Sequence, residues 1–276
     1  MWHFIAVFLR QRIVQVSAFF LMGFVVERLA TADRSITKAN RAFNCAYTVF
    51  FQVFDFTAGS LFAMYVYSMA VKMPGKGLIS LPVSDRGILP FAIILAFSSS
   101  ILRDFFYYWF HRLQHASRWL WAQHALHHSD ECMNVTTTWR HHWLEMPMET
   151  VAVIVPAAVL FKPPIVTIPL AYLITQGMSY FIHLNSRISL GPLTPIIAGP
   201  QTHRIHHSKL PEHIDKNFAA IFPLWDVIFG TYYHPKKGEC PPCGLASGET
   251  VHSFRYALLM PFITWVKMLK RGKETH

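Results

Sequence analysis

Charged residues are scarce in this chain. They make up 14% of its 276 residues, whereas a typical soluble domain carries about 25%. Hydrophobic residues make up 53%, against about 45–50% in soluble domains. The apolar residues come in blocks separated by histidine-rich polar stretches, and no change in composition marks a second domain. The composition therefore favours one helical membrane domain with a polar catalytic part.

Acidic residues are scarcer than basic ones: there are 15 of them against 25, which gives a formal net charge of +10. A nucleic-acid-binding domain usually gathers such an excess on one face, but here the basic residues are dispersed among aromatic and aliphatic runs. We therefore expect no nucleic-acid partner and a bilayer with anionic headgroups instead. The densest basic run follows the apolar stretch 256–266 and predicts a cytoplasmic C-terminus by the positive-inside rule. It consists of Lys267, Lys270, Arg271 and Lys273.

Cysteine is also rare. Four cysteines, scattered along a chain of this length, are too few for a disulfide scaffold, so we expect reduced thiols. Cys240 and Cys243 have the spacing of a redox or zinc pair, but no second Cys/His pair lies near them in the sequence. The expectation for this pair is a surface loop.

Apolar runs long enough to span a bilayer, which takes about 20 residues, are few. Four regions approach that length, at residues 4–26, 42–71, 87–102 and 151–182. In the last region Pro163 and Pro164 interrupt the helical hydrogen-bond ladder, which predicts a hairpin of two short helices. The first region has no small-residue cleavage site, so we expect a retained membrane segment there. The predicted fold is an all-α, integral-membrane helical bundle with about four transmembrane helices.

Histidine, in contrast, is abundant. Eleven of the sixteen histidines lie between positions 111 and 207, and eight of these form three tight groups. Spacings of i, i+3 and i, i+4 within a group place imidazoles on one helix face, with Cβ atoms about 5–6 Å apart. The eight residues are His111, His115, His124, His127, His128, His203, His206 and His207. The histidines expected not to bind metal are His3, His213, His234, His252 and His276.

A metal centre accounts for so many clustered imidazoles. A buried polar group left unpaired costs about 1–3 kcal/mol, and the sequence offers too few carboxylates to pair them all. Eight imidazoles are twice what one tetrahedral site uses, so two ions are implied. Imidazole binds zinc, copper, nickel and iron, but only redox-active ions can activate O2 against an unactivated C–H bond, whereas zinc supports hydrolysis.

These motifs resemble the fatty acid hydroxylase and sterol desaturase superfamily of integral-membrane di-iron enzymes. The resemblance covers about residues 90–235. Its residues are Asp104, His111, His115, Trp121, the segment 124–129, Asn134, the segment 140–145, His203, His206, His207, the segment 215–218, Trp225, Asp226 and the segment 229–231. Ala219 and Ala220 depart from the family pattern, which has glycine after the aromatic residue.

The resemblance implies a helical membrane domain whose histidine site faces the cytoplasm. It implies two Fe ions as cofactor, O2 as co-substrate, a lipid substrate, and electrons from a separate reductase or small electron carrier. It also assigns His183 as a further metal ligand. Other residues would orient the ligands by bonding the ring nitrogen that faces away from the metal, called the outer nitrogen below. The alternative for them is helix capping or a surface role. They are Asp104, Asn134, His142, Glu145, Asp215, Asn217 and Asp226.

Three parts are expected along the chain. Residues 1–85 form N-terminal membrane helices, residues 86–235 a catalytic domain like that of the fatty acid hydroxylases and sterol desaturases, and residues 236–276 a tail with an apolar segment and a basic end.

The predicted activity is that of a membrane-bound di-iron oxidoreductase that uses O2 to hydroxylate or desaturate a C–H bond of a lipid, whether fatty acyl, sterol or related. One alternative is cleavage of an ether lipid, as in alkylglycerol monooxygenases. Others are a non-redox zinc lipid hydrolase, a metal transporter, or a membrane cytochrome. Haem usually takes its axial ligands from separate spans, whereas these histidines lie together in polar segments.

Overall fold

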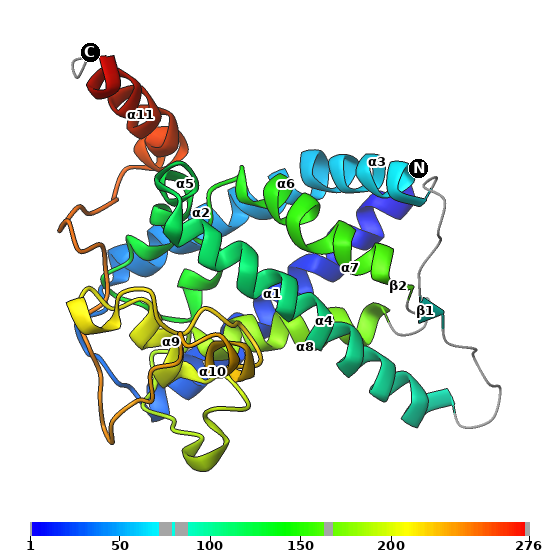
Figure 1. The fold of residues 1–276 in the computed structure, drawn as a ribbon, viewed down its shortest axis with the longest axis horizontal. Coiled ribbons are helices and arrows are strands. Elements are labelled where there is room, and N and C mark those ends of the chain that lie inside the picture. The colour runs from blue at the N-terminus through cyan, green and yellow to red at the C-terminus, as the bar shows by residue number, and fades with distance from the viewer. Residues whose placement is uncertain (1, 72–78, 81–87, 163–167, 274–276) are drawn as a thin grey trace.

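Helices form nearly all of the regular structure. The computed structural model describes residues 2–71, 79–80, 88–162 and 168–273 (Figure 1). The first helices are α1 (Trp2–Leu29), α2 (Lys38–Phe54), the π-helical η1 (Asp55–Gly59), α3 (Ser60–Val71), α4 (Ile88–Ala116) and α5 (Arg118–His128). After them come η2 (Val135–Trp139), α6 (Glu145–Glu149), the π-helical η3 (Thr150–Ile154), α7 (Val155–Leu160) and α8 (Ile168–Ile182). The last are η5 (Gly191–Leu193), α9 (Pro200–His206), η6 (Pro211–His213), α10 (Leu224–Ile228) and α11 (Phe254–Lys273).

The all-α prediction is confirmed. Within the described residues, the strands are limited to a parallel pair of two residues each, β1 (Ile79–Ser80) and β2 (Phe161–Lys162). The hairpin predicted for residues 151–182 has η3 and α7 before the prolines and α8 after them. Its turn at Pro163 and Pro164 lies outside the described residues, and so does the domain boundary predicted at residues 85 and 86.

The longest helix extends beyond the apolar run that predicted it. The run was expected to end at residue 102, but α4 continues through Arg103 and Asp104 to His111 and His115. These two charged residues do not end the helix because both have partners: Arg103 pairs with Glu149, and Asp104 accepts backbone N–H groups at 2.9–3.2 Å from residues 220–222. The apolar half of α4 and the part that carries the two histidines therefore form one continuous helix.

A single helical stretch of the described chain, Pro90–Ala116, is long and apolar enough by composition to cross a membrane. The other predicted regions do form helices: residues 4–26 lie within α1, and residues 42–71 form α2, η1 and α3. Asp55 begins the π-helical segment between α2 and α3, so that region is not one regular helix.

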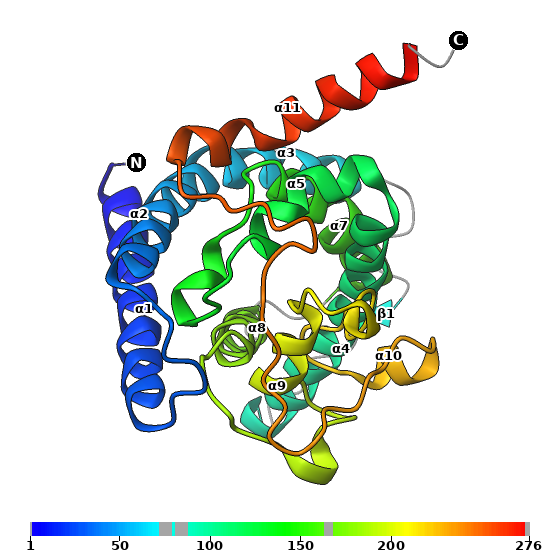
Figure 2. The ribbon, with the colours of Figure 1, turned by 90° about the vertical axis from the view of Figure 1, so that its left-hand side faces the viewer.

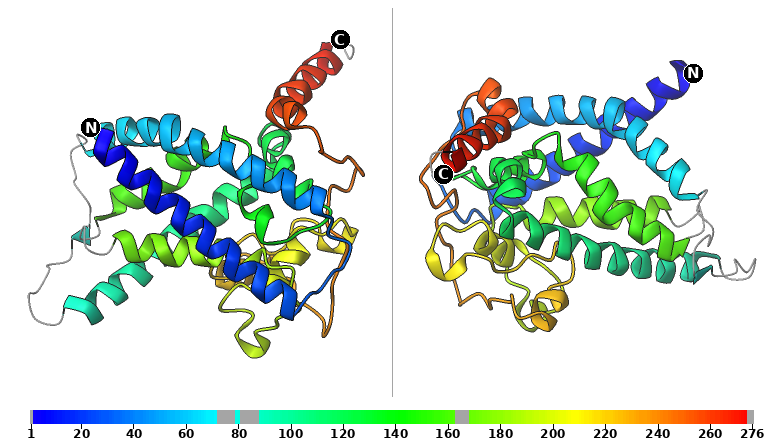
Figure 3. Two further views of the ribbon diagram at one scale, coloured as in Figure 1. Left: turned by 180° about the vertical axis from the view of Figure 1, so that it is seen from behind. Right: turned by 45° about the horizontal axis from the view of Figure 1, so that its top comes forward.

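The long helices lie side by side and carry the histidine segments at one end. Figure 1 shows α9 and α10 beside the end of α4, and Figure 3 shows α1 running diagonally across the back of the molecule. The first turns of α11 pack against α5, where Ala257 and Met260 are buried and the Trp265 indole donates to the Trp119 carbonyl at 2.8 Å. Figure 2 shows the rest of α11 projecting past the bundle.

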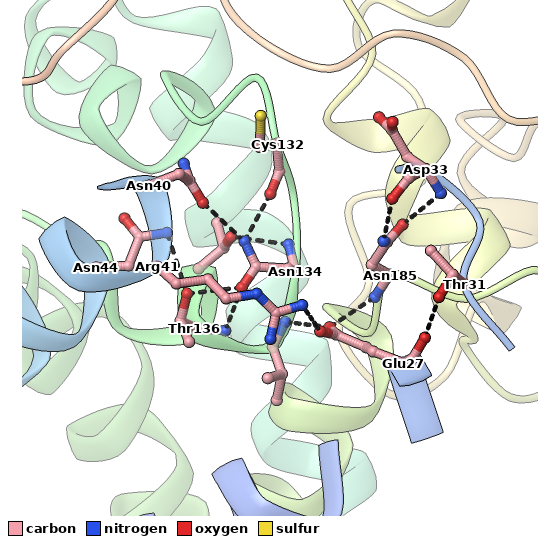
Figure 4. Close-up of polar contacts among 12 residues, drawn as sticks. Glu27, Thr31, Asp33, Asn40, Arg41, Asn44, Cys132, Asn134, Thr136 and Asn185 are labelled. Atoms are coloured by element: carbon pink, nitrogen blue, oxygen red, sulfur yellow. Dashed lines mark hydrogen bonds and ion pairs between the residues drawn. The ribbon is translucent and has the colours of Figure 1, made fainter. Parts of the chain in front are cut away.

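A buried carboxylate at the end of α1 ties this helix to the histidine end (Figure 4). Glu27 is 2% exposed and accepts the backbone N–H groups of Val135 at 2.6 Å and Asn185 at 2.9 Å. Its second oxygen accepts a hydrogen bond from the Arg41 guanidinium at 2.7 Å. Since Val135 begins η2 and Asn185 follows His183, α1 fixes the position of two segments next to the site.

Candidate metal centre

Four stretches of chain bring the nine predicted ligands together. His111 and His115 come from α4, His124, His127 and His128 from α5, His183 follows α8, and the last three belong to α9 and its C-terminal end. Eight of the nine are buried, and the His115 side chain is 7% exposed. Possible ligand atoms from the nine rings gather into two groups, in each of which they lie within 4.8 Å of one another. The five-histidine group is His111, His115, His124, His128 and His206, and the four-histidine group is His127, His183, His203 and His207.

The four-histidine group is held through its Nε2 atoms. The Nε2 atom of His183 lies 3.2 Å from that of His127 and 3.0 Å from that of His203, and the Nε2 atoms of His203 and His207 are 3.1 Å apart. Ligand nitrogens placed tetrahedrally at a metal–nitrogen distance of about 2.0–2.1 Å are themselves about 3.3 Å apart. The observed spacing is close to that of a coordination shell.

The five-histidine group lies directly beside it. The Nε2 atoms of His111 and His124 are 3.0 Å apart, and the rings of His111 and His206 have centroids 4.4 Å apart. The two groups touch where the rings of His128 and His207 stack at 4.4 Å. The nine imidazoles therefore form two adjoining groups of possible ligands.

Hydrogen bonds on the outer face of the rings fix which nitrogen is free. The Nδ1 atom of His111 lies 2.7 Å from the Phe218 carbonyl, that of His183 2.7 Å from the Ser179 carbonyl, and that of His206 2.9 Å from the Lys216 carbonyl. A carbonyl oxygen only accepts, so each Nδ1 carries the proton and each Nε2 presents a lone pair to the centre of the group.

Two carboxylates lie beside the Nδ1 atoms of further histidines. Glu145 is 3% exposed, and its Oε1 lies 3.2 Å from the His124 Nδ1. Asp215 Oδ1 is 3.5 Å from the His115 Nδ1. Both orient a predicted ligand through its outer nitrogen, the arrangement that metal-bound histidines usually have.

The protonation state and the unpaired atoms fit a metal. Burial, and then the neighbouring imidazoles, lower the pKa of His127, His203 and His207 well below the usual histidine range, so these rings are neutral. In the described part of the chain, the buried Nε2 atoms of His128 and His206 have no hydrogen-bond partner. Because unpaired buried nitrogens are costly, a bound cation that accepts their lone pairs satisfies this donor set.

His141 is a site residue that the sequence analysis missed. Its ring stacks on the His127 ring at 4.0 Å, and its Nδ1 lies 2.9 Å from Glu145 Oε2. With His124 and Glu145 it forms a third cluster of possible ligands. Burial alone would lower the pKa of His141, but the Glu145 carboxylate outweighs burial and raises that pKa. The signal in the sequence was the i, i+4 spacing of His141 and Glu145.

His142, predicted for the outer-nitrogen role, lies elsewhere. Its Nε2 is 3.0 Å from the Leu258 carbonyl of α11, and its ring lies 5.3 Å from that of Trp143. The family resemblance assigned the role to His142, whereas the structure turns His141 toward the clustered rings.

Among the residues that the structure describes, Asn134 forms no hydrogen bond with an imidazole. It caps η2, where its Oδ1 accepts the Thr136 N–H at 3.1 Å, and it donates to Asn40 at 3.0 Å (Figure 4). Asn217 binds backbone, accepting the Tyr233 N–H at 2.8 Å.

Asp104 and Asp226 act on the ligands through the loop of residues 215–222. Asp226 is fully buried and accepts the N–H groups of Phe218 at 2.8 Å and Ala219 at 2.9 Å. It thereby holds the peptide whose carbonyl orients His111. Asp215 and Asn217 both have φ of +57°, a left-handed conformation that Asp and Asn tolerate better than most residues. Ala219 and Ala220 have no positive φ, so the absence of glycine there carries no strain.

The cysteine pair lies close to the last histidine segment. Cys243 is 1% exposed and forms a short antiparallel bridge with Ser208, next to His207. Burial raises the pKa of its thiol to about 12, and all four cysteines are free, as expected. The segment is thus partly buried against the site, rather than the exposed loop that was predicted.

A cavity of about 520 Å³ adjoins both histidine groups. His111 of one group and His127, His183 and His203 of the other contribute to its wall. The same cavity extends between α4, α7 and α8, where Leu102, Ala157 and Ile182 line it together with serine, threonine, tyrosine and glutamine side chains. A long apolar molecule in it would reach the two groups directly.

Comparisons with known proteins agree with this geometry. Residues 96–231 match the family model for fatty acid hydroxylase. Human alkylglycerol monooxygenase is 36% identical over 129 residues, which are 47% of this chain and 28% of that protein. An ornithine lipid hydroxylase of Rhizobium tropici is 28% identical over 204 residues, 74% of this chain and 60% of that protein.

A putative methylsterol monooxygenase of Dictyostelium discoideum is 28% identical over 174 residues, 61% of this chain and 60% of that protein. The chain therefore spans less than a third of the alkylglycerol monooxygenase and about three fifths of the other two relatives. No solved structure gives a significant match.

Proposed function

We propose that the chain is a membrane-bound di-iron oxidoreductase that uses O2 to oxidise a C–H bond of a lipid, because residues 96–231 match the family model for fatty acid hydroxylase. The observation that carries the proposal is the pair of adjoining histidine groups on the wall of one cavity. Its oxygenase character is supported by relatives described as monooxygenases and hydroxylases.

Each histidine group would hold one ion. The four-histidine group offers converging Nε2 atoms, and the five-histidine group offers lone pairs whose direction is fixed by Glu145 and the loop carbonyls. Iron bound there would supply the activation of O2 that an unactivated C–H bond requires. The chain's own part is to keep the imidazoles neutral, aim them, and exclude water by burial.

The membrane location is supported by the outward side of the long helices. Large apolar side chains are exposed on α1, for example Ile13 at 64% and Leu21 at 65%, and on α4, for example Ile94 at 61%. Soluble proteins rarely expose contiguous apolar surface on this scale, whereas a bilayer covers it. About four membrane-spanning segments, with the histidine end in the cytoplasm, agree with this surface and with the basic end of α11.

Electrons would come from a separate reductase or small electron carrier. Oxidation of one C–H bond by O2 takes two electrons from outside the substrate when one oxygen atom is inserted and the other leaves as water. The family resemblance implies such a donor, and the buried di-metal centre would receive electrons across the cytoplasmic end of the bundle.

Cleavage of an ether lipid is the second candidate within the same chemistry. It is favoured by the identity of 36% to alkylglycerol monooxygenase, higher than the 28% to the two other relatives named here. Oxidation of the carbon next to an ether oxygen would give this outcome, so substrate placement and not the metal site separates the candidates.

The test is oxygen dependence with isotope tracing. Iron-loaded protein in detergent would be given lipid extract, a chemical reductant and oxygen-18 gas, and lipids would be followed by mass spectrometry. We expect a product that carries the label or has lost two hydrogens, and none under argon. A lipid product formed equally well without oxygen would contradict the proposal and favour zinc hydrolysis.

A further inference from the structure

The cavity has a length and a lining that the histidine site does not explain. On α8 it is lined from Ala171 to Ile182, a rise of about 16 Å at 1.5 Å per residue. Ala157 and Ala158 of α7 and Ala171 of α8 contribute small side chains to this wall. This is room for a hydrocarbon chain that approaches the histidines.

Two ion pairs lie on the wall of the cavity. Arg12 of α1 lies 3.2 Å from Asp55, and Arg103 of α4 pairs with Glu149. All four residues line the cavity, and the Arg12 and Asp55 side chains are only 15% and 18% exposed. Taking charges out of water is costly, and an apolar pair of similar volume usually stabilises a buried position as well. Charges retained within a membrane domain are by default candidates for function.

Irregular helix geometry places both carboxylates. Asp55 is the first residue of the π-helical η1, and Glu149 immediately precedes the π-helical η3. Single π-helical turns occur frequently at functional sites. Gly59 leaves room for the first carboxylate, because a Cβ atom there would lie 2.9 Å from Asp55 Oδ1.

Both arginines on the cavity wall are already paired with carboxylates. The lining includes two arginines against three carboxylates, the third being Glu145. Each arginine already has a carboxylate partner, and the Arg12 Nε also donates to the side-chain Oε1 of Gln52 at 2.7 Å. A carboxylate or phosphate on a ligand at these ion pairs would therefore find no unpaired arginine, whereas an uncharged polar group needs none.

Gln176 brings to this wall a polar atom without a hydrogen-bond partner among the described residues. The Gln176 Oε1 atom is buried and, within the described residues, accepts no hydrogen bond. Gln176 lies one turn beyond Tyr172 on α8, and the Arg12 guanidinium lies 5.3 Å from the Tyr172 ring centroid. A ligand that donates a hydrogen bond near the ion pair would satisfy this acceptor.

From these features we propose that the cavity selects lipids whose polar part is uncharged and carries a hydrogen-bond donor, such as a hydroxyl or amide group, and discriminates against anionic lipids. The Gln176 Oε1 accepts the hydrogen bond of the ligand. The Arg12–Asp55 and Arg103–Glu149 pairs form polar surroundings without an unpaired charge. This inference rests on the proposed function only in taking the cavity as the substrate site.

The test measures binding of matched lipids to the purified protein in detergent, without reductant. Hexadecylglycerol, an uncharged diol, is compared with hexadecanoate at a pH where its carboxylate is ionised. We expect the diol to bind at least about tenfold more tightly, which is about 1.4 kcal/mol. Equal or tighter binding of the anion by the unmodified protein would overturn the proposal.

Charge-switch variants sharpen the test because they predict a gain. Asp55→Asn removes the partner charge of Arg12 and should raise the affinity for hexadecanoate, while Gln176→Leu should weaken only the diol. Glu149→Gln makes the same prediction through Arg103, should Asp55→Asn fail to fold. A folded variant whose ratio of affinities is unchanged would count against the ion pairs as selectors.

Matched controls lie outside the cavity. Leu173→Met alters the exposed face of α8, and Glu131→Gln removes the charge of a solvent-exposed pair with Lys209. Neither should change the ratio. Since the readout needs no oxygen or turnover, failure of the oxygenase proposal leaves this result interpretable, and failure here leaves the oxygenase test intact.

Discussion

At the scale of single residues, the direction of each imidazole is set from outside the metal site. Carbonyl or carboxylate acceptors hold the Nδ1 atoms, and the Nε2 atoms converge. Glu145 is the most connected of these acceptors, since it meets His124, His141 and the Gln114 amide. Its replacement should therefore affect metal binding without removing a ligand.

Glu145→Gln should lower iron affinity by about 10–100-fold, the usual effect of losing a partner that orients a ligand. The amide keeps the shape but can no longer accept from both histidines as an anion. Competition with a graded series of chelators would measure the change. Glu131→Gln, at an exposed ion pair, is the control, and equal iron retention in both variants would refute the role given to Glu145.

One histidine from each group gives a second prediction. His127→Ala and His206→Ala should each reduce bound iron from about two ions per chain toward one and abolish turnover, because each group serves one ion. His252→Ala changes an exposed histidine and should leave the metal content unchanged. Full turnover in either of the first two variants would contradict the assignment of the groups.

At the scale of elements, the loop of residues 215–222 connects α4 and α9, because its carbonyls bind His111 of α4 and His206 of α9. Asp226→Leu would leave two buried N–H groups and the Thr231 hydroxyl without their acceptor. Each buried unsatisfied donor costs about 1–3 kcal/mol. We expect a clear fall in thermal midpoint together with loss of iron, measured by thermal unfolding and metal analysis. Glu212→Gln, at an exposed position of η6, should have neither effect.

Much of the site was predictable from the sequence because histidine spacing on helices is a local property. The spacings of His111 with His115 and of His124 with His127 and His128 depend only on the helical repeat. Which histidines from different helices share an ion depends on tertiary packing, so the division into five and four was not predictable. The same holds for His141, which precedes α6 and meets the His127 ring only through tertiary packing.

The long helices were also foreseen, but their irregularities were not. Apolar runs predict helices, and α1 follows its run closely. The π-helical segments at Asp55 and Thr150 depend on contacts between distant residues, such as Arg12 with Asp55, that no local pattern contains. The end of α4 was misplaced for a similar reason, since partners in other segments stabilise Arg103 and Asp104.

At the scale of the whole molecule, the C-terminus reports on the position of the metal site. The first half of α11 packs on α5 (Figure 2). There the His142 Nε2 lies 3.0 Å from the Leu258 carbonyl. Both ends of that contact must lie on one side of a bilayer. A fluorescent protein fused after α11 should fluoresce, as it does when it is cytoplasmic, and an alkaline phosphatase fused there should be inactive. An active phosphatase would place the site on the opposite side.

The identity and coupling of the metal ions decide the central claim most directly. Protein purified in detergent from cells grown on iron-57 would be analysed for metal content and by Mössbauer spectroscopy. We expect about two irons per chain with the signals of a coupled high-spin pair, because two neutral imidazole groups adjoin each other. Firmly bound zinc from native membranes, with no iron even before purification, would contradict the di-iron oxygenase.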